Sequence, residues 1–177
     1  MRKEVFTIVV VAICVVCPLY CAGDDNAITA GYGFGIFNLD PKFGKLRGDG
    51  RYYYFYQITY AREKALVKNL YLLMEPFAAY VNDPQSGLDA GMTMSLKYYF
   101  GKDNKNSFFA TLGTGAAYTT IAFEEQGTHL LLILQGGIGY RWNNYFIENR
   151  FRHYSNGNTE RPNRSINANI VNIGVHF

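Results

Sequence analysis

Charged residues are scarce in this chain of 177 residues: Asp, Glu, Lys and Arg make up 18% of it, and the formal net charge is +3. So small a positive excess gives no reason to expect nucleic acid as a partner. The sequence also lacks a glycine-rich phosphate loop and a Cys/His cluster with metal-ligand spacing, so we expect neither a cofactor nor a metal. After residue 23, no apolar run is long enough for a membrane-spanning helix.

The N-terminal segment has the pattern of a secretion signal. A positive start at Arg2 and Lys3 leads into an apolar run over 5–16, which is too short to span a membrane. Small residues precede the cleavage that we expect after Gly23. We therefore predict a signal peptide at 1–23 and a mature domain at 24–177.

Cysteine is missing from the predicted mature domain, because Cys14, Cys17 and Cys21 all fall within the signal. The exported protein is therefore expected to have no disulfide and no thiol chemistry. A lipoprotein attached through Cys21 is an alternative, but Tyr20 is larger than the small residue usual before a lipidated cysteine.

Tyr (15 residues), Phe (13) and Gly (18) are abundant instead, a composition that suits strands better than helices. Runs of alternating character, separated by polar or glycine-containing turns, predict eight strands. Each is long enough to cross a bilayer when tilted, which takes roughly 9–11 residues. The strands are expected at 27–37, 51–62, 69–81, 88–100, 107–121, 129–141, 145–155 and 166–177.

The connections between these strands alternate in kind. Those at 38–50, 82–87, 122–128 and 156–165 vary and are often long, whereas those at 63–68, 101–106 and 142–144 are short and polar. This alternation is typical of outer-membrane barrels, in which the short turns are periplasmic. An even number of strands then places both termini in the periplasm.

The last strand alternates apolar and polar residues and ends on Phe177, which resembles the recognition signal of the barrel-assembly machinery. An edge strand of a soluble periplasmic sandwich is the alternative, but a closed barrel removes such an exposed edge. We predict an all-β fold, an eight-stranded antiparallel transmembrane β-barrel over 24–177 in the bacterial outer membrane. Its narrow interior should be filled by side chains.

The seventh strand shows which of its side chains must face inward. A charged residue on the lipid face costs about 2–4 kcal/mol at mid-bilayer for Arg, so Glu148, Arg150 and Arg152 should point into the barrel. The alternation then turns His153 and Ser155 outward. On the eighth strand the apolar residues are odd-numbered and should face lipid, so Asn167 also faces outward. The three side chains should therefore meet on the outer wall near the extracellular rim.

A His and a Ser in contact, oriented by a third polar group, are the parts of an acyl-transfer site. His153 and Ser155 lie two residues apart on one face, about 6–7 Å along the strand. The alternative is that these polar side chains merely end the strands in the polar layer above the hydrocarbon.

The stretch 152–157 (Arg-His-Tyr-Ser-Asn-Gly), followed by Pro162-Asn163 and a closing strand, resembles PagL-type lipid A 3-O-deacylases. That family consists of eight-stranded outer-membrane barrels that remove the 3-position acyl chain of lipid A. The resemblance implies a serine esterase without metal. It assigns the general base to His153, the nucleophile to Ser155, oxyanion stabilisation to Asn156 and the Gly157 amide, and a polar loop role to Asn163.

The third member of the triad departs from the best-known form of the family, which has Glu where this chain has Asn167. Asn can accept a hydrogen bond from His and fix its tautomer, but it cannot stabilise the imidazolium by charge. Glu160 in the neighbouring loop is an alternative source of that charge. The expected substrate is lipid A in the outer leaflet. A catalytically weak or inactive structural or surface-binding barrel is the alternative function, and a homodimer is left open.

Overall fold

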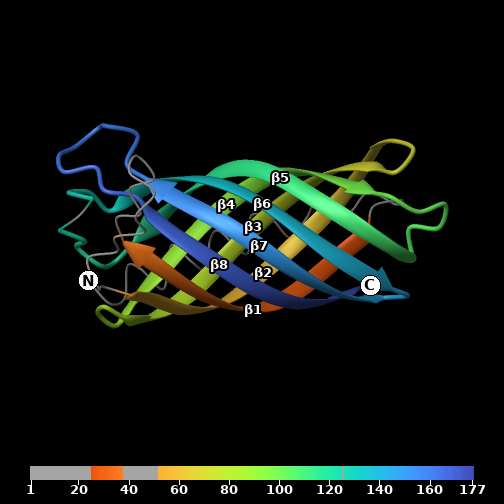
Figure 1. Cartoon of the computed structure of the whole chain (residues 1–177), viewed down its shortest axis with the longest axis horizontal. Coiled ribbons are helices and arrows are strands. Elements are labelled where there is room, and N and C mark those ends of the chain that lie inside the picture. The colour runs from red at the N-terminus through yellow and green to blue at the C-terminus, as the bar shows by residue number, and fades with distance from the viewer. Residues whose placement is uncertain (1–24, 38–51, 125) are drawn as a thin grey trace, which may run out of the picture.

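The computed structural model describes residues 25–37, 52–124 and 126–177, and there eight antiparallel strands close into a barrel (Figure 1). Their bounds are β1 (Asp25–Phe37), β2 (Tyr52–Val67), β3 (Leu70–Asp83), β4 (Gly87–Tyr99), β5 (Asn106–Thr119), β6 (Leu130–Trp142), β7 (Tyr145–Ser155) and β8 (Ile166–His176). Pairing of β1 with β8 closes the sheet. The predicted fold class is therefore confirmed, and the soluble sandwich is excluded.

The predicted signal peptide at 1–23 and the predicted connection at 38–50 lie outside the described residues. No helix in the described part of the chain is long and apolar enough to cross a membrane.

Most predicted strand boundaries differ from the observed ones by two residues at most, but the predicted end of β2 is wrong by five. Residues 63–67, predicted as part of a connection, continue β2, and the turn is confined to Lys68 and Asn69. Two features extend the strand. Glu63 faces inward and binds Lys97 Nζ at 2.5 Å, and Asn69 adopts a left-handed φ of 65° that permits a tight turn.

The connections divide the barrel into two ends. The turn end holds the short turns at 68–69, 100–105 and 143–144 and the C-terminal Phe177. The loop end holds the connections at 84–86, 120–129 and 156–165. In Figure 1 the loop after β7 projects at the left, and the C-terminus lies at the right. The end of β7 and the start of β8 therefore meet at the loop end.

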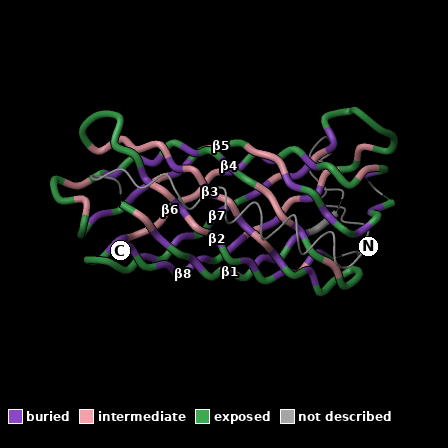
Figure 2. The backbone as a smooth tube through the Cα atoms, turned by 180° about the vertical axis from the view of Figure 1, so that it is seen from behind, coloured by how far each residue is buried: buried purple, intermediate pink, exposed green. Residues whose placement is uncertain are grey.

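Burial alternates along the strands, as Figure 2 shows in the succession of buried and exposed residues. Glu148, Arg150 and Arg152 point inward, as the sequence predicted, and each is at most 4% exposed. Arg150 Nη2 binds Glu148 Oε2 at 2.7 Å and Glu75 Oε1 at 2.9 Å. The described interior thus holds paired charged groups beside a cluster of buried apolar and aromatic side chains, and the pairing compensates charges that would be costly on the lipid face.

Glycines on the inner wall make room for aromatic rings. The Phe55 ring lies against Gly33 and the Phe109 ring against Gly139, so that an added Cβ would overlap each ring. These contacts let large side chains fill a narrow barrel and account for part of the abundance of glycine.

Candidate functional site

The site lies on the outer wall where β7 ends and β8 begins. His153 of β7 is in register with Asn167 of β8. His153 Nδ1 lies 2.8 Å from Asn167 Oδ1, and both side chains are half-buried. Outward parity on two neighbouring antiparallel strands brings these residues, 14 positions apart in the chain, into hydrogen-bond contact.

The neighbour of Asn167 orients its amide. Asn167 Nδ2 lies 3.3 Å from Ser165 Oγ, so the amide nitrogen is directed toward Ser165 and the oxygen toward the imidazole. In this arrangement the oxygen accepts a hydrogen bond from the Nδ1–H of His153. The proton then resides on Nδ1, which leaves Nε2 with a lone pair that can accept a proton.

Ser155 ends β7 two residues beyond His153 on the same face, and its side chain is half-buried. Within the described residues, neither Ser155 Oγ nor His153 Nε2 has a hydrogen-bond partner. The structure thus places the two groups beside each other, without the hydrogen bond between them that a Ser–His pair uses in proton transfer. In the absence of substrate such bonds are often long and form when the substrate binds.

The loop after β7 is organised around Asn156, whose side chain is buried. Asn156 Nδ2 lies 2.6 Å from the carbonyl oxygen of Gln126 and 2.9 Å from that of Glu160, and Asn156 Oδ1 accepts from the amide of Asn158. These bonds engage both polar groups of the side chain within the loops. Asn156 therefore ties two loops together through its side-chain amide.

Asn163 has a related role in the same loop. Its Oδ1 accepts from the backbone amide of Asn156 at 3.1 Å, and its Nδ2 donates to Asn158 Oδ1 at 3.0 Å. The backbone N–H of Asn156 therefore already has a hydrogen-bond acceptor. The amide of the exposed Gly157 makes no hydrogen bond within the described residues, and Gly157 has a left-handed φ of 64°. Of the two predicted oxyanion donors, Asn156 is engaged within the loop, and the Gly157 amide has no partner in the described part of the chain.

Glu160 does not act as the third member of the triad beside His153 Nδ1 in this structure. Its side chain is exposed and forms no hydrogen bond or ion pair with the part of the chain that the structure describes. Asn167 holds the Nδ1 side of the imidazole instead. The third polar group beside His153 is thus an uncharged amide.

Two groups that orient residues of the site were not predicted from the sequence. Ser165 lies two residues before Asn167 on the same face, so strand parity would have found it. The Gln126 carbonyl, which fixes Asn156 from a loop 30 residues away, carries no sequence signal because a backbone oxygen is common to every residue.

Among the described residues, no group of three or more His, Cys, Asp or Glu side chains is arranged to hold a metal ion.

The fold and these side chains together define a class of protein, an outer-membrane β-barrel with a Ser and a His–Asn pair on the outer face of its wall. A family model described as lipid A 3-O-deacylase (PagL) matches residues 48–176. The chain belongs to this family, which is a family of outer-membrane hydrolases.

Solved structures agree in fold. The chain is similar to the outer-membrane enzyme PagL, with 17% sequence identity and a TM-score of 0.64 over 84% of this chain and 98% of PagL. It is also similar to the neisserial surface protein A (NspA), with 11% identity and a TM-score of 0.55 over 88% of this chain and 98% of NspA. No curated protein matches the chain in sequence.

Proposed function

We propose that this protein is a lipid A 3-O-deacylase that hydrolyses the ester-linked acyl chain at the 3-position of lipid A through Ser155, His153 and Asn167. The observation that carries the proposal is the hydrogen bond between His153 Nδ1 and Asn167 Oδ1 on the outer wall, with Ser155 next on the same face. Family membership supports lipid A as the substrate.

The reaction follows from this arrangement. His153 Nε2 takes the proton of Ser155 Oγ as the oxygen attacks the ester carbonyl, and the Gly157 amide donates a hydrogen bond to the developing oxyanion. The tetrahedral intermediate collapses, and protonated His153 returns the proton to the departing 3-hydroxyl oxygen of the sugar. Water, deprotonated by His153, then cleaves the acyl-Ser155 ester. The products are deacylated lipid A and a free fatty acid.

Asn167 orients the imidazole in this scheme without adding charge. Replacing the acid of a Ser-His-Asp triad with Asn costs about 10⁴ in kcat where the amide presents the wrong hydrogen-bonding group to the imidazole. Here the amide oxygen faces Nδ1, so the tautomer that catalysis needs is retained. The loss is then confined to the missing charge on the imidazolium.

The membrane orientation completes the proposal. The loop end faces the cell exterior and the turn end faces the periplasm, as the alternation of long and short connections favours. An outward-facing site at the loop end then lies level with the outer leaflet, where lipid A resides. The acyl chains meet the site without leaving the membrane.

The test replaces the nucleophile in intact cells. Wild-type protein and Ser155→Ala are expressed in a host whose lipid A carries the 3-position chain, and lipid A is analysed by mass spectrometry. Ser86→Ala is the matched control, because Ser86 lies in the 84–86 connection at the same end of the barrel. We expect loss of one acyl chain with wild type and the control and intact lipid A with Ser155→Ala. Chain loss with Ser155→Ala contradicts the mechanism.

Intact lipid A with a well-folded wild-type barrel supports the alternative, a structural or surface-binding barrel. A gain of activity in Asn167→Glu in that same host identifies a weakened enzyme instead. Recognition by the barrel-assembly machinery through the strand that ends on Phe177, and a homodimer, stay predictions.

A further inference from the structure

The outer wall differs in chemistry on the two sides of the Ser155–His153–Asn167 site. This difference bears on how a substrate would lie, and the inference drawn from it rests on the proposed function. On the β6 side, Leu132 is in register with Ser155, and Leu134 with His153. Both leucines are exposed, at 47% and 57%. This side of the site is aliphatic.

The aliphatic side continues toward the middle of the wall. Gly136, two residues beyond Leu134, leaves a place without a side chain, where an added Cβ would meet Thr111 O at 3.4 Å and Leu112 Cδ1 at 3.6 Å. Leu132 reaches the other way, to within 2.7 Å of a Cβ built on Gly157. An acyl chain whose carbonyl lies at Ser155 and the Gly157 amide therefore has leucine beside its first carbons, then a one-residue gap at Gly136, and then the exposed Ile138 further along β6.

The opposite side carries tyrosines. Four outward-facing tyrosines on β1 and β2 form a contiguous cluster, named here the tyrosine cluster: Tyr32, Tyr52, Tyr54 and Tyr56. The Tyr32 and Tyr54 rings stack with centroids 6.4 Å apart and an interplanar angle of 9°, and the Tyr52 and Tyr54 rings stack at 5.8 Å and 21°. Such a cluster offers ring faces and hydroxyl groups together.

The tyrosine cluster is continuous with the site across β8. Phe34 of β1 is in register with Tyr54 on one side and with Asn169 of β8 on the other. Asn169 in turn is in register with Phe151, two residues before His153. Three strand spacings separate β7 from β2, or roughly 14–15 Å. That span suits a disaccharide headgroup that bridges the site and the cluster.

The aromatic residues are not distributed as two even belts. At the loop end, outward aromatic residues gather on β1–β3 as the tyrosine cluster with Phe34 and Tyr80, and β4–β8 add Tyr118 and Phe151. At the turn end the exposed aromatic side chains of the described residues gather mainly on β4–β7, where Tyr98, Phe108, Trp142 and Tyr145 lie, while Phe100 follows β4 and Phe177 follows β8. A belt that merely matched the membrane interface would encircle each end.

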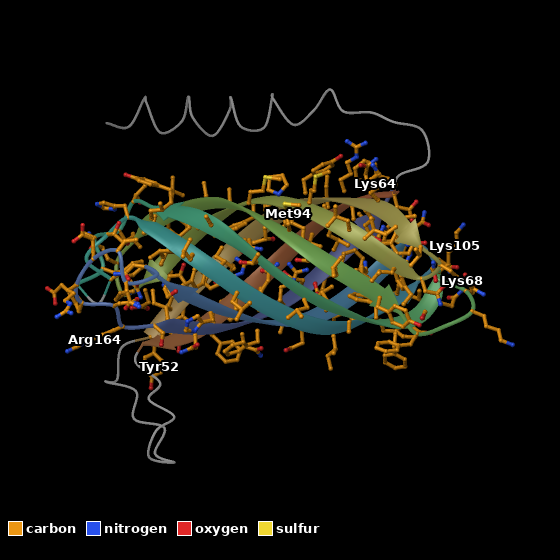
Figure 3. All side chains as sticks on the ribbon, turned by 90° about the horizontal axis from the view of Figure 1, so that it is seen from above. Tyr52, Lys64, Lys68, Met94, Lys105 and Arg164 are labelled. Atoms are coloured by element: carbon orange, nitrogen blue, oxygen red, sulfur yellow. The ribbon has the colours of Figure 1, made fainter. Side chains whose placement is uncertain are left out.

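A positive charge borders the same region. Arg164 precedes β8 by two residues, is exposed, and forms no side-chain hydrogen bond or ion pair with the residues that the structure describes. Figure 3 shows Arg164 and Tyr52 at the same end of the barrel, opposite the end that carries Lys64, Lys68 and Lys105. An exposed guanidinium without a partner among the described residues, at the same end of the barrel as the tyrosine cluster, suits a sugar that bears phosphate.

We infer that the tyrosine cluster and Arg164 form the headgroup subsite of this enzyme, and that β6 forms its acyl subsite. The phosphorylated sugar lies over β1 and β2 with a phosphate at Arg164. The ester carbonyl lies at Ser155, and the acyl chain runs along Leu132, Leu134 and Gly136. The wall thereby fixes the direction in which lipid A approaches the nucleophile.

The test compares two substrates on the purified full-length barrel in detergent. One is lipid A, and the other is a p-nitrophenyl ester with a matched acyl chain and no sugar. The headgroup variants are Tyr54→Leu/Tyr56→Leu and Arg164→Gln. The matched control is Tyr98→Leu/Tyr145→Leu, which removes two outward tyrosines at the turn end. The measured quantity is the ratio of kcat/KM for lipid A to kcat/KM for the simple ester.

We expect each headgroup variant to lower this ratio about tenfold or more, since one or two lost hydrogen bonds have that effect, and the control to leave it unchanged. The effect of Arg164→Gln should disappear with dephosphorylated lipid A. An unchanged ratio in the headgroup variants, or an equal fall in the control, overturns the inference and identifies the tyrosines as general membrane contacts. If wild type cleaves neither ester, the proposed function itself fails, so the two failures are distinguishable.

Discussion

The two faces of β7 use polar side chains in opposite ways. Inside the barrel, the Arg150 guanidinium binds two carboxylates, those of Glu75 and Glu148, and all three groups are at most 5% exposed. On the outer face, His153 has one bond, to Asn167, and Ser155 has none within the described residues. Polar side chains whose hydrogen-bonding groups all have partners stabilise a fold. Polar side chains with unused donors or acceptors can bind and transform a substrate.

His153→Ala tests the outer face at its centre and should have the largest effect. Loss of the general base should lower kcat on lipid A by about 10⁴-fold or more. The barrel should remain folded, because His153 is half-buried on the outer wall and its removal leaves no buried charge. Deacylation kinetics give the first quantity, and heat-modifiable gel mobility reports folding. Substantial activity in a folded His153→Ala barrel would remove His153 from the mechanism.

Arg150→Met tests the inner face. It leaves Glu75 and Glu148 buried without their cation, which should cost about 3–5 kcal/mol of the free energy of unfolding. Urea unfolding in detergent or lipid vesicles measures this loss. Adding Glu75→Gln and Glu148→Gln should recover much of the stability, because the uncompensated charges are then gone. If Arg150→Met unfolds like wild type, the interior pairs are not structural.

Asn167 combines the structural and the catalytic use of polar side chains, because its amide holds the imidazole of His153 in place for catalysis. Asn167→Asp should raise kcat by about tenfold or more, because a carboxylate both fixes the tautomer and stabilises the imidazolium. Asn167→Leu should lower kcat by about 10²-fold or more, because the tautomer is no longer fixed. Both variants are compared at saturating lipid A, where kcat is measured. Equal activity in Asp, Asn and Leu forms would contradict an orienting role.

Gly157→Ala should have the smallest effect. The left-handed φ of 64° costs a residue with a Cβ about 1–2 kcal/mol, and the added methyl would lie 2.7 Å from Leu132 Cδ1. The loop should shift and move the amide, so kcat/KM on both esters falls while barrel stability stays close to wild type. Asn143→Gly, which relieves a left-handed φ of 54° in the turn at the other end of the barrel, is the control and should leave activity near wild type. Full activity in Gly157→Ala would exclude its amide as an oxyanion donor.

Local patterns predicted most of the fold. Eight alternating runs gave the strands to within a few residues, because side-chain period and turn chemistry are local properties. The end of β2 was missed, because Glu63 to Val67 look like a polar connection until Lys97 and the strand partners on β3 are known. A charged residue inside a barrel and one in a turn have the same sequence signal.

The sequence by itself determined that this is a barrel and which side of β7 is outside. Charged side chains are costly on the lipid face and so point inward, and because successive side chains of a strand point to opposite faces, their neighbours point outward. It also placed His153, Ser155 and Asn167 on one face. Only the tertiary structure decided which of the site residues are engaged elsewhere: Asn156 and Asn163 bind loop groups, and the Gly157 amide has no partner among the described residues. It also brought the tyrosines of β1 and β2 beside β7 and β8, because the pairing that closes the barrel joins the two ends of the chain.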